Sequence, residues 1–231
     1  MTHENSAPTA ASASRSQRLR GVIFDMDGVL VDSEPWIEKA ARALFAEHGR
    51  EIPDSLFRSF VGMGEDLFLR EVAAALHVEI DTAVAKRRLY ELYLELTRGR
   101  LGPAQGAREF ISRCREQGLR IAVASSADDM KVRGNLEELG LPADAFDAVV
   151  TGSQVARKKP APDLFLEAAR RLDIDPRDCL IIEDAVAGIA AAKIIGARCL
   201  GITTTFAPED LREADWVAPN LAGAPPDVLN W

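Results

Sequence analysis

Acidic residues stand directly after two short apolar runs of this 231-residue chain. The first run ends in Asp25 and Asp27, and the second ends in Glu183 and Asp184. In an extended chain, Asp25 and Asp27 leave the same side because they are two residues apart. Four carboxylates gathered at one place would repel one another, and a divalent cation would offset their charge. We expect Mg²⁺, because it takes oxygen ligands and commonly shares them with a substrate phosphate.

Hydroxyl and ammonium groups follow two further apolar runs. Ser125 and Ser126 end one of them, and Lys159 stands shortly before an expected helix. These three side chains are candidates for holding phosphate oxygens. With the phosphate charge offset, Asp25 can attack phosphorus to form an aspartyl-phosphate. Asp27, crowded by like charge, can hold a proton for the leaving oxygen and later deprotonate water.

Helices and strands must alternate to place these residues together. Apolar runs predict strands over 21–24, 120–124, 148–151, 179–182 and 198–202. Helical periodicity predicts helices over 107–117, 129–139, 162–172 and 186–195. This alternation is typical of a parallel sheet covered on both faces, and ligands bind such sheets at the carboxyl ends of the strands.

A purely helical block separates the first strand from the rest. Apolar residues three and four apart predict helices over 36–48, 55–60, 65–77 and 81–97. We therefore predict an α/β fold with a doubly wound, Rossmann-like parallel sheet and an all-helical cap inserted after its first strand. The predicted division is a disordered tail at 1–18, a core at 19–33 and 101–231, and a cap at 34–100.

Composition limits the partners of this protein. The chain has 28 Lys and Arg residues against 36 Asp and Glu residues, a net charge of −8. This acidic balance argues against nucleic acid and against an anionic membrane surface. Three cysteines without a CxxC pair indicate reduced thiols. We expect a monomeric cytoplasmic protein whose partner is a small phosphorylated metabolite.

Four segments resemble the haloacid dehalogenase-like hydrolase superfamily, in particular its capped phosphatases and β-phosphoglucomutase-like enzymes. They are FDMDGVLVDSE at 24–34, ASS at 124–126, KPAPD at 159–163, and IEDA at 182–185 followed by GI at 188–189 and AA at 191–192. The resemblance spans residues 19 to about 206. One departure is Lys158, which stands where the family usually has glycine, so Lys159 is taken as the catalytic lysine.

The resemblance implies roles for individual residues. Asp25 is the implied nucleophile and Asp27 the implied acid/base, with Ser125 and Lys159 contacting the phosphate. The implied Mg²⁺ ligands are Asp25, the Asp27 carbonyl, Glu183 and Asp184.

Three functions remain open within this resemblance. We favour a Mg²⁺-dependent phosphatase acting on a sugar or polyol phosphate-like monoester. A β-phosphoglucomutase-like mutase is the alternative, although its distal phosphate would meet Glu65 and Asp128, where such mutases carry cationic or amide groups. A non-catalytic regulatory module comes third, because it would have no reason to keep four costly carboxylates. Glu65 and Asp128 either select a neutral or cationic leaving group or are solvated residues at helix starts.

Overall fold

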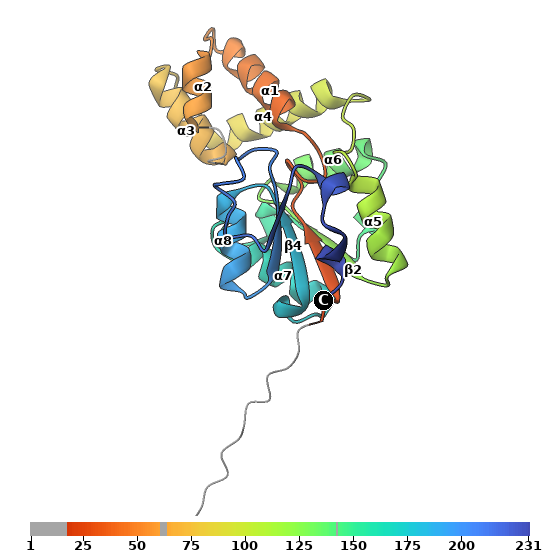
Figure 1. Cartoon of the computed structure of the whole chain (residues 1–231). Coiled ribbons are helices and arrows are strands. Elements are labelled where there is room, and N and C mark those ends of the chain that lie inside the picture. Colours follow the sequence, from red (N-terminus) through yellow and green to blue (C-terminus); the bar gives the residue numbers. More distant parts are fainter. Residues whose placement is uncertain (1–17, 61–63, 142) are drawn as a thin grey trace, which may run out of the picture.

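A six-stranded sheet forms the centre of the protein (Figure 1). The computed structural model describes residues 18–60, 64–141 and 143–231. The strand order is β3-β2-β1-β4-β5-β6, and all paired strands are parallel. The strands are β1 (Gly21–Phe24), β2 (Arg120–Ala124), β3 (Ala148–Val150), β4 (Cys179–Glu183), β5 (Arg198–Ile202) and β6 (Trp216–Ala218).

The strands are nearly continuous apolar runs because both faces of the sheet are covered. In β1, Val22 and Phe24 pack into one core and Ile23 into the other. Helices α5 and α6 cover the first face together with C-terminal residues, and α7 and α8 cover the second. These helices are α5 (Ala107–Glu116), α6 (Asp129–Glu138), α7 (Asp163–Leu172) and α8 (Val186–Ile194).

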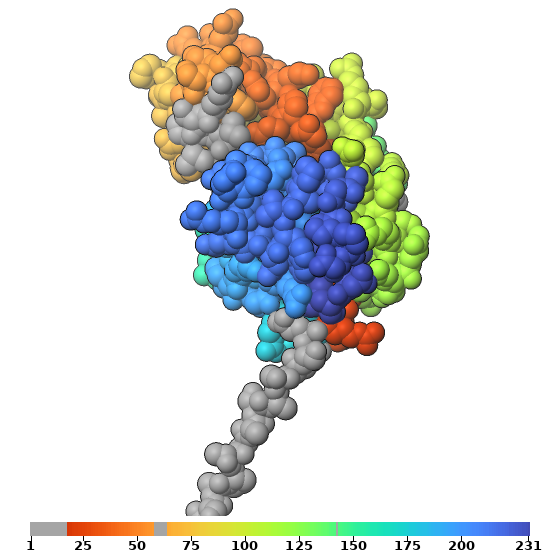
Figure 2. All heavy atoms as spheres, viewed as in Figure 1, coloured from red at the N-terminus to blue at the C-terminus, as the bar shows by residue number. Residues whose placement is uncertain are grey.

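Four helices lie between β1 and α5 and build a third hydrophobic cluster of their own. They are α1 (Glu34–Glu47), α2 (Asp54–Phe60), α3 (Glu65–Ala75) and α4 (Thr82–Thr97). They sit beyond one end of the sheet (Figure 1) and rest against the core in the space-filling view (Figure 2). This helical insertion after the first strand is called the cap below.

The cap contacts the core most closely where α4 runs along α6. The Tyr93 hydroxyl of α4 donates a hydrogen bond to Asn135 Oδ1 of α6 at 2.8 Å, and both side chains are buried. Gly134 lies so close to Leu94 that an added Cβ would overlap that side chain. This packing places the first turn of α6 beneath the cap.

The predicted fold class is confirmed, and most predicted elements end within two residues of the observed bounds. Strand β6 was not predicted. Five 3₁₀ helices complete the described elements: Ala143–Ala145, Gly152–Gln154, Pro176–Asp178, Leu221–Gly223 and Pro226–Leu229. Apart from Arg18, the predicted tail lies outside the described residues. Within the described ranges, none of the helices has the length and apolar character that crossing a membrane requires.

Candidate active site

Three carboxylates meet at the carboxyl ends of β1 and β4. Asp25 follows β1, Glu183 ends β4 and Asp184 comes next, and all three are buried. Each offers one oxygen, and these oxygens lie within 4.8 Å of one another. The sheet topology explains the meeting, because β1 and β4 are hydrogen-bonded neighbours whose carboxyl ends share one edge.

Lys159 supplies the positive charge beside this cluster. Its Nζ lies 2.5 Å from Asp25 Oδ1, also contacts Glu183 Oε1, and donates to the Ala124 carbonyl at 3.2 Å. Burial acts to lower the pKa of the Lys159 ammonium, but the Asp25 and Glu183 carboxylates outweigh burial and raise it. Lys159 therefore stays charged and orients the oxygen of Asp25.

The cluster keeps an excess of negative charge. Three carboxylates face one ammonium, and burial raises the pKa of Asp25 to about 7 despite the opposing effect of Lys159. Burial, with Glu183 beside it, also raises the pKa of Asp184. A divalent cation with oxygen ligands would offset this excess negative charge, so Asp25, Glu183 and Asp184 fit a metal site.

Two glycines make room for the cluster. Gly28 has a φ of +77°, and a Cβ there would overlap the Asp184 carboxylate. Gly188, in the first turn of α8, lies against the carboxylate of Glu183, where a Cβ would again overlap. The Glu183 carboxylate also accepts the N–H groups of Asp184 and Ala185, each at 3.1 Å. These contacts hold the cluster in one geometry.

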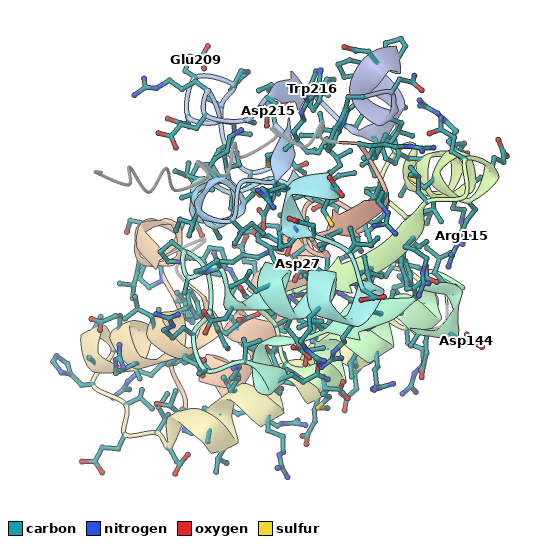
Figure 3. All side chains as sticks on the ribbon, turned by 90° about the horizontal axis from the view of Figure 1, so that it is seen from below. Asp27, Arg115, Asp144, Glu209, Asp215 and Trp216 are labelled. Carbon is teal, nitrogen blue, oxygen red and sulfur yellow. The ribbon has the colours of Figure 1, made fainter. Side chains whose placement is uncertain are left out.

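Asp27 lies beside the acidic cluster rather than within it. Its Oδ1 accepts hydrogen bonds from the Ser33 hydroxyl and from Lys131 Nζ, the latter at 2.9 Å. In the view of Figure 3, Asp27 lies near the middle of the molecule, whereas the labelled Asp144 and Glu209 lie at its outline. Asp27 keeps about a third of its side chain exposed, facing a cavity of about 620 Å³.

The expected phosphate ligands line the same cavity. Ser125, Ser126 and Lys159 all border it, and Asp25 and Asp27 do so from the segment after β1. The buried Ser125 hydroxyl accepts the Ala127 N–H at 3.1 Å, which fixes its direction. The structure thus gathers every residue that the sequence assigned to nucleophile, acid/base, phosphate and metal around one space.

The two candidate specificity residues lie in different surroundings. Glu65, at the start of α3, borders the cavity. The Asp128 carboxylate instead pairs with Lys86 of the cap at 2.8 Å and with Lys158 at 3.5 Å, and Asp128 is not among the described residues that line the cavity. A role for either residue in substrate choice stays a prediction.

Sequence reasoning missed three polar contacts at the site. The Thr205 hydroxyl donates to Asp184 Oδ2 at 2.5 Å, and the Thr204 hydroxyl donates to the Gly28 carbonyl at 2.6 Å. Both threonines come shortly after the end of β5, so the criterion that identified the other site residues, a polar side chain after a strand, could have identified them too. Lys131 gave no such signal, because a lysine in the first turn of a helix usually faces water.

Comparisons with known proteins agree with this geometry. A family model described as haloacid dehalogenase-like hydrolase matches residues 19–196. Hexitol phosphatase A of Escherichia coli (strain K12) is 30% identical over 204 residues, which is 88% of this chain and 92% of that protein. The crystal structure of CbbY from Rhodobacter sphaeroides in complex with phosphate superposes with a TM-score of 0.79 at 27% identity, covering 88% of this chain and 95% of that chain.

A longer relative shares the same region. Protein SUPPRESSOR OF QUENCHING 1, chloroplastic, from Arabidopsis thaliana is 41% identical over 200 residues, or 85% of this chain. This chain spans only 19% of that protein. The family model covers well over half of the chain, and the strand-end residues of the family meet around one cavity. The chain therefore belongs to the haloacid dehalogenase-like hydrolase family.

Proposed function

We propose that the protein is a Mg²⁺-dependent phosphatase that hydrolyses a small phosphorylated sugar or polyol through an aspartyl-phosphate on Asp25. The observation that carries this proposal is the buried Asp25 carboxylate, held by Lys159 at 2.5 Å and facing the cavity shared with Ser125. The two other buried carboxylates of the cluster stand next to it.

Asp25 and Asp27 divide the chemistry between them. An Asp25 carboxylate oxygen attacks phosphorus while the bond from phosphorus to the leaving oxygen breaks, and that oxygen takes a proton from Asp27. Asp27 then takes a proton from water, whose oxygen attacks phosphorus and breaks its bond to Asp25. Inorganic phosphate leaves, and both aspartates return to their starting states.

The remaining polar residues hold the phosphoryl group. Ser125, Ser126 and Lys159 border the cavity and are the donors that we assign to its oxygens. Asp25, the Asp27 carbonyl, Glu183 and Asp184 would hold Mg²⁺. When bound, Mg²⁺ neutralises the approaching phosphate and so lowers the repulsion between it and the Asp25 carboxylate.

The leaving group would enter from the cap. The cavity reaches the cap side chains Phe57, Phe68 and Leu89 as well as the acidic Glu65. The apolar side chains and Glu65 favour an uncharged leaving group, and Arg70 and Lys158, which also border the cavity, are the cations that a second phosphate would need. The likeness to hexitol phosphatase A supports a polyol or sugar phosphate. We also propose that the core comprises 19–33 and 101–231, that the cap comprises 34–100, and that the protein is a monomer.

The test is a phosphate-release screen over a panel of sugar and polyol phosphates, run with Mg²⁺ and with a chelator. We expect one subset of the panel to release phosphate only with Mg²⁺, and Asp25→Asn to abolish the release. Incubation with β-glucose 1-phosphate addresses the mutase alternative. Glucose 6-phosphate formed in place of free phosphate would contradict the proposal, and inactivity on every member would favour a binding module.

A further inference from the structure

Lys131 is a buried cation at the boundary between the cap and the core. It belongs to the first turn of α6, and only 4% of its side chain is exposed. Its Nζ lies 2.9 Å from Asp27 Oδ1 and 3.6 Å from Glu65 Oε1. The ring of Tyr93 in α4 lies 5.3 Å from the same nitrogen. One ammonium thus contacts an acid of the core, an acid of the cap and an aromatic ring of the cap.

Burying an ammonium is costly unless charged partners offset the lost hydration. One partner belongs to the core and the other to the cap, because Asp27 follows β1 and Glu65 begins α3, and both line the active-site cavity. Lys131 can keep both partners only while the cap rests on the core. The Tyr93–Asn135 hydrogen bond at 2.8 Å holds α4 against the same helix and keeps Lys131 enclosed.

Both contacts of the Asp27 carboxylate described above are made to the same oxygen. The Ser33 hydroxyl and Lys131 Nζ both bind Oδ1, so together they fix the rotation of the carboxylate. The other oxygen, Oδ2, is then the one that we assign to proton transfer with the leaving group. A general acid has to stand within hydrogen-bond reach of the oxygen that it protonates, and small misplacements are costly.

We infer that Lys131 is a positioning residue, which fixes the Asp27 carboxylate toward the leaving oxygen and joins it to Glu65 when the cap is closed. This inference rests on the proposed phosphatase function. It assigns to Lys131 no contact with the phosphoryl group, a role that we propose for Lys159, which contacts Asp25, and for the two serines.

The dependence of rate on the leaving group separates positioning from mere structural support. An alkoxide is a poor leaving group and needs a proton from Asp27, whereas 4-nitrophenolate leaves readily without one. Loss of a well-placed general acid therefore lowers kcat/KM, which reports the steps up to departure of the leaving group, much more for an alkyl phosphate than for 4-nitrophenyl phosphate. A general loss of folding or of phosphate binding lowers both rates by the same factor.

The experiment measures kcat and KM of the full chain for 4-nitrophenyl phosphate and for the best alkyl phosphate from the screen. The variants are Lys131→Met, Asp27→Asn as the reference for a lost acid, and Lys86→Met as the matched control. Lys86 is also a buried lysine at the cap–core boundary, but it pairs with Asp66 at 3.0 Å and Asp128 at 2.8 Å rather than with Asp27.

We expect Lys131→Met to lower the ratio of alkyl to aryl kcat/KM by about tenfold or more, in the direction of Asp27→Asn. Lys86→Met should leave that ratio at the wild-type value. Lys131→Arg, which keeps the charge, should recover part of the ratio. Equal losses on both substrates in Lys131→Met, or an unchanged ratio, would overturn the inference.

Folding of each variant is checked by far-UV circular dichroism. If Lys131→Met does not fold, Glu65→Gln takes its place, since it removes the acid that joins Lys131 to the cap and leaves the core intact. We expect the same ratio to fall by about threefold, and no change would overturn the inference. Wild-type protein inactive on both substrates would contradict the proposed function itself, and the inference would fall with it.

Discussion

Lys159 Nζ lies 2.5 Å from Asp25 Oδ1, and both side chains are about nine-tenths buried. The lysine reaches the aspartate from the segment before α7, while Asp25 follows β1 at the centre of the sheet. The two residues are 134 positions apart in the chain. Their meeting joins the proposed nucleophile to the charge that lets a phosphate approach it.

Replacing Lys159 by Met should weaken both activity and the metal-free fold. The variant leaves Asp25 and Glu183 buried without their ammonium, which typically costs about 3 kcal/mol or more in the free energy of unfolding. We expect phosphate release to fall by about 10²-fold or more. Urea unfolding in chelator measures the stability.

The matched control for that variant is Lys193→Met. Lys193 pairs with Asp215 at 2.5 Å, but about a third of each side chain is exposed. Such exposed pairs contribute less than about 1 kcal/mol. Equal losses of stability in the two variants would show that Lys159 is not held as the structure describes.

Metal-free protein should lose stability as the pH rises through the range set by Asp25. Burial raises the pKa of this carboxyl from 3.8 to about 7 in the folded state. Between these values the folded state holds a proton that the unfolded chain has released, so raising the pH favours unfolding. The stabilisation that protonation of Asp25 gives is complete below the pKa of this carboxyl in the unfolded chain. It is lost as the pH rises through the pKa of the same carboxyl in the folded state.

Mg²⁺ binds the deprotonated carboxylates, so its stabilising effect should grow over the same range. Thermal unfolding with and without Mg²⁺ checks this. The rise in Tm on adding Mg²⁺ should be clearly larger at about pH 8 than at about pH 5. A rise that is the same at both pH values, or larger at the lower one, would argue against a metal on this cluster.

Gly188→Ala should damage the metal site without unfolding the protein at large. The added Cβ would overlap the Glu183 carboxylate and push it from its place in the cluster. We expect the Mg²⁺ concentration for half-maximal stabilisation to rise about 10- to 100-fold. The measurement is a thermal-shift titration with Mg²⁺, which reports binding independently of catalysis.

Gly102→Ala is the control, because a Cβ at Gly102 meets no atom within 4 Å among the described residues. Its Mg²⁺ titration should match the wild type, and its stability should stay within about 0.5 kcal/mol. If both variants bind Mg²⁺ like the wild type, Glu183 is not a ligand of the ion.

The sequence predicts the helices and strands well because most of them have a clear hydrophobic pattern. Strand β4 is an apolar run that ends in Glu183, and every residue of it is buried. Strand β6 was missed although β3, which is just as short, was predicted, because Val217 of β6 is exposed and Trp216 only half-buried. A short run that is also partly exposed carries no alternation that would distinguish it from a loop.

The residues of the site also fall into those that the sequence predicts and those that only the tertiary structure shows. Asp25, Glu183 and Asp184 stand at strand ends, so the topology of a parallel sheet is enough to bring them together. The role of Lys131 depends on the packing of α6 beneath α4, which no local pattern encodes. The pairing of Asp128 with Lys86 likewise joins two elements whose relative placement only the tertiary structure shows.

The most direct test asks whether the phosphoryl group passes through Asp25. Wild-type protein is mixed with its best substrate and Mg²⁺, quenched rapidly in acid, and digested for mass spectrometry. We expect a phosphoryl group on Asp25 during turnover, and neither that adduct nor phosphate release in Asp25→Asn. Undiminished phosphate release by Asp25→Asn, or a phosphoryl group on another residue, would contradict it.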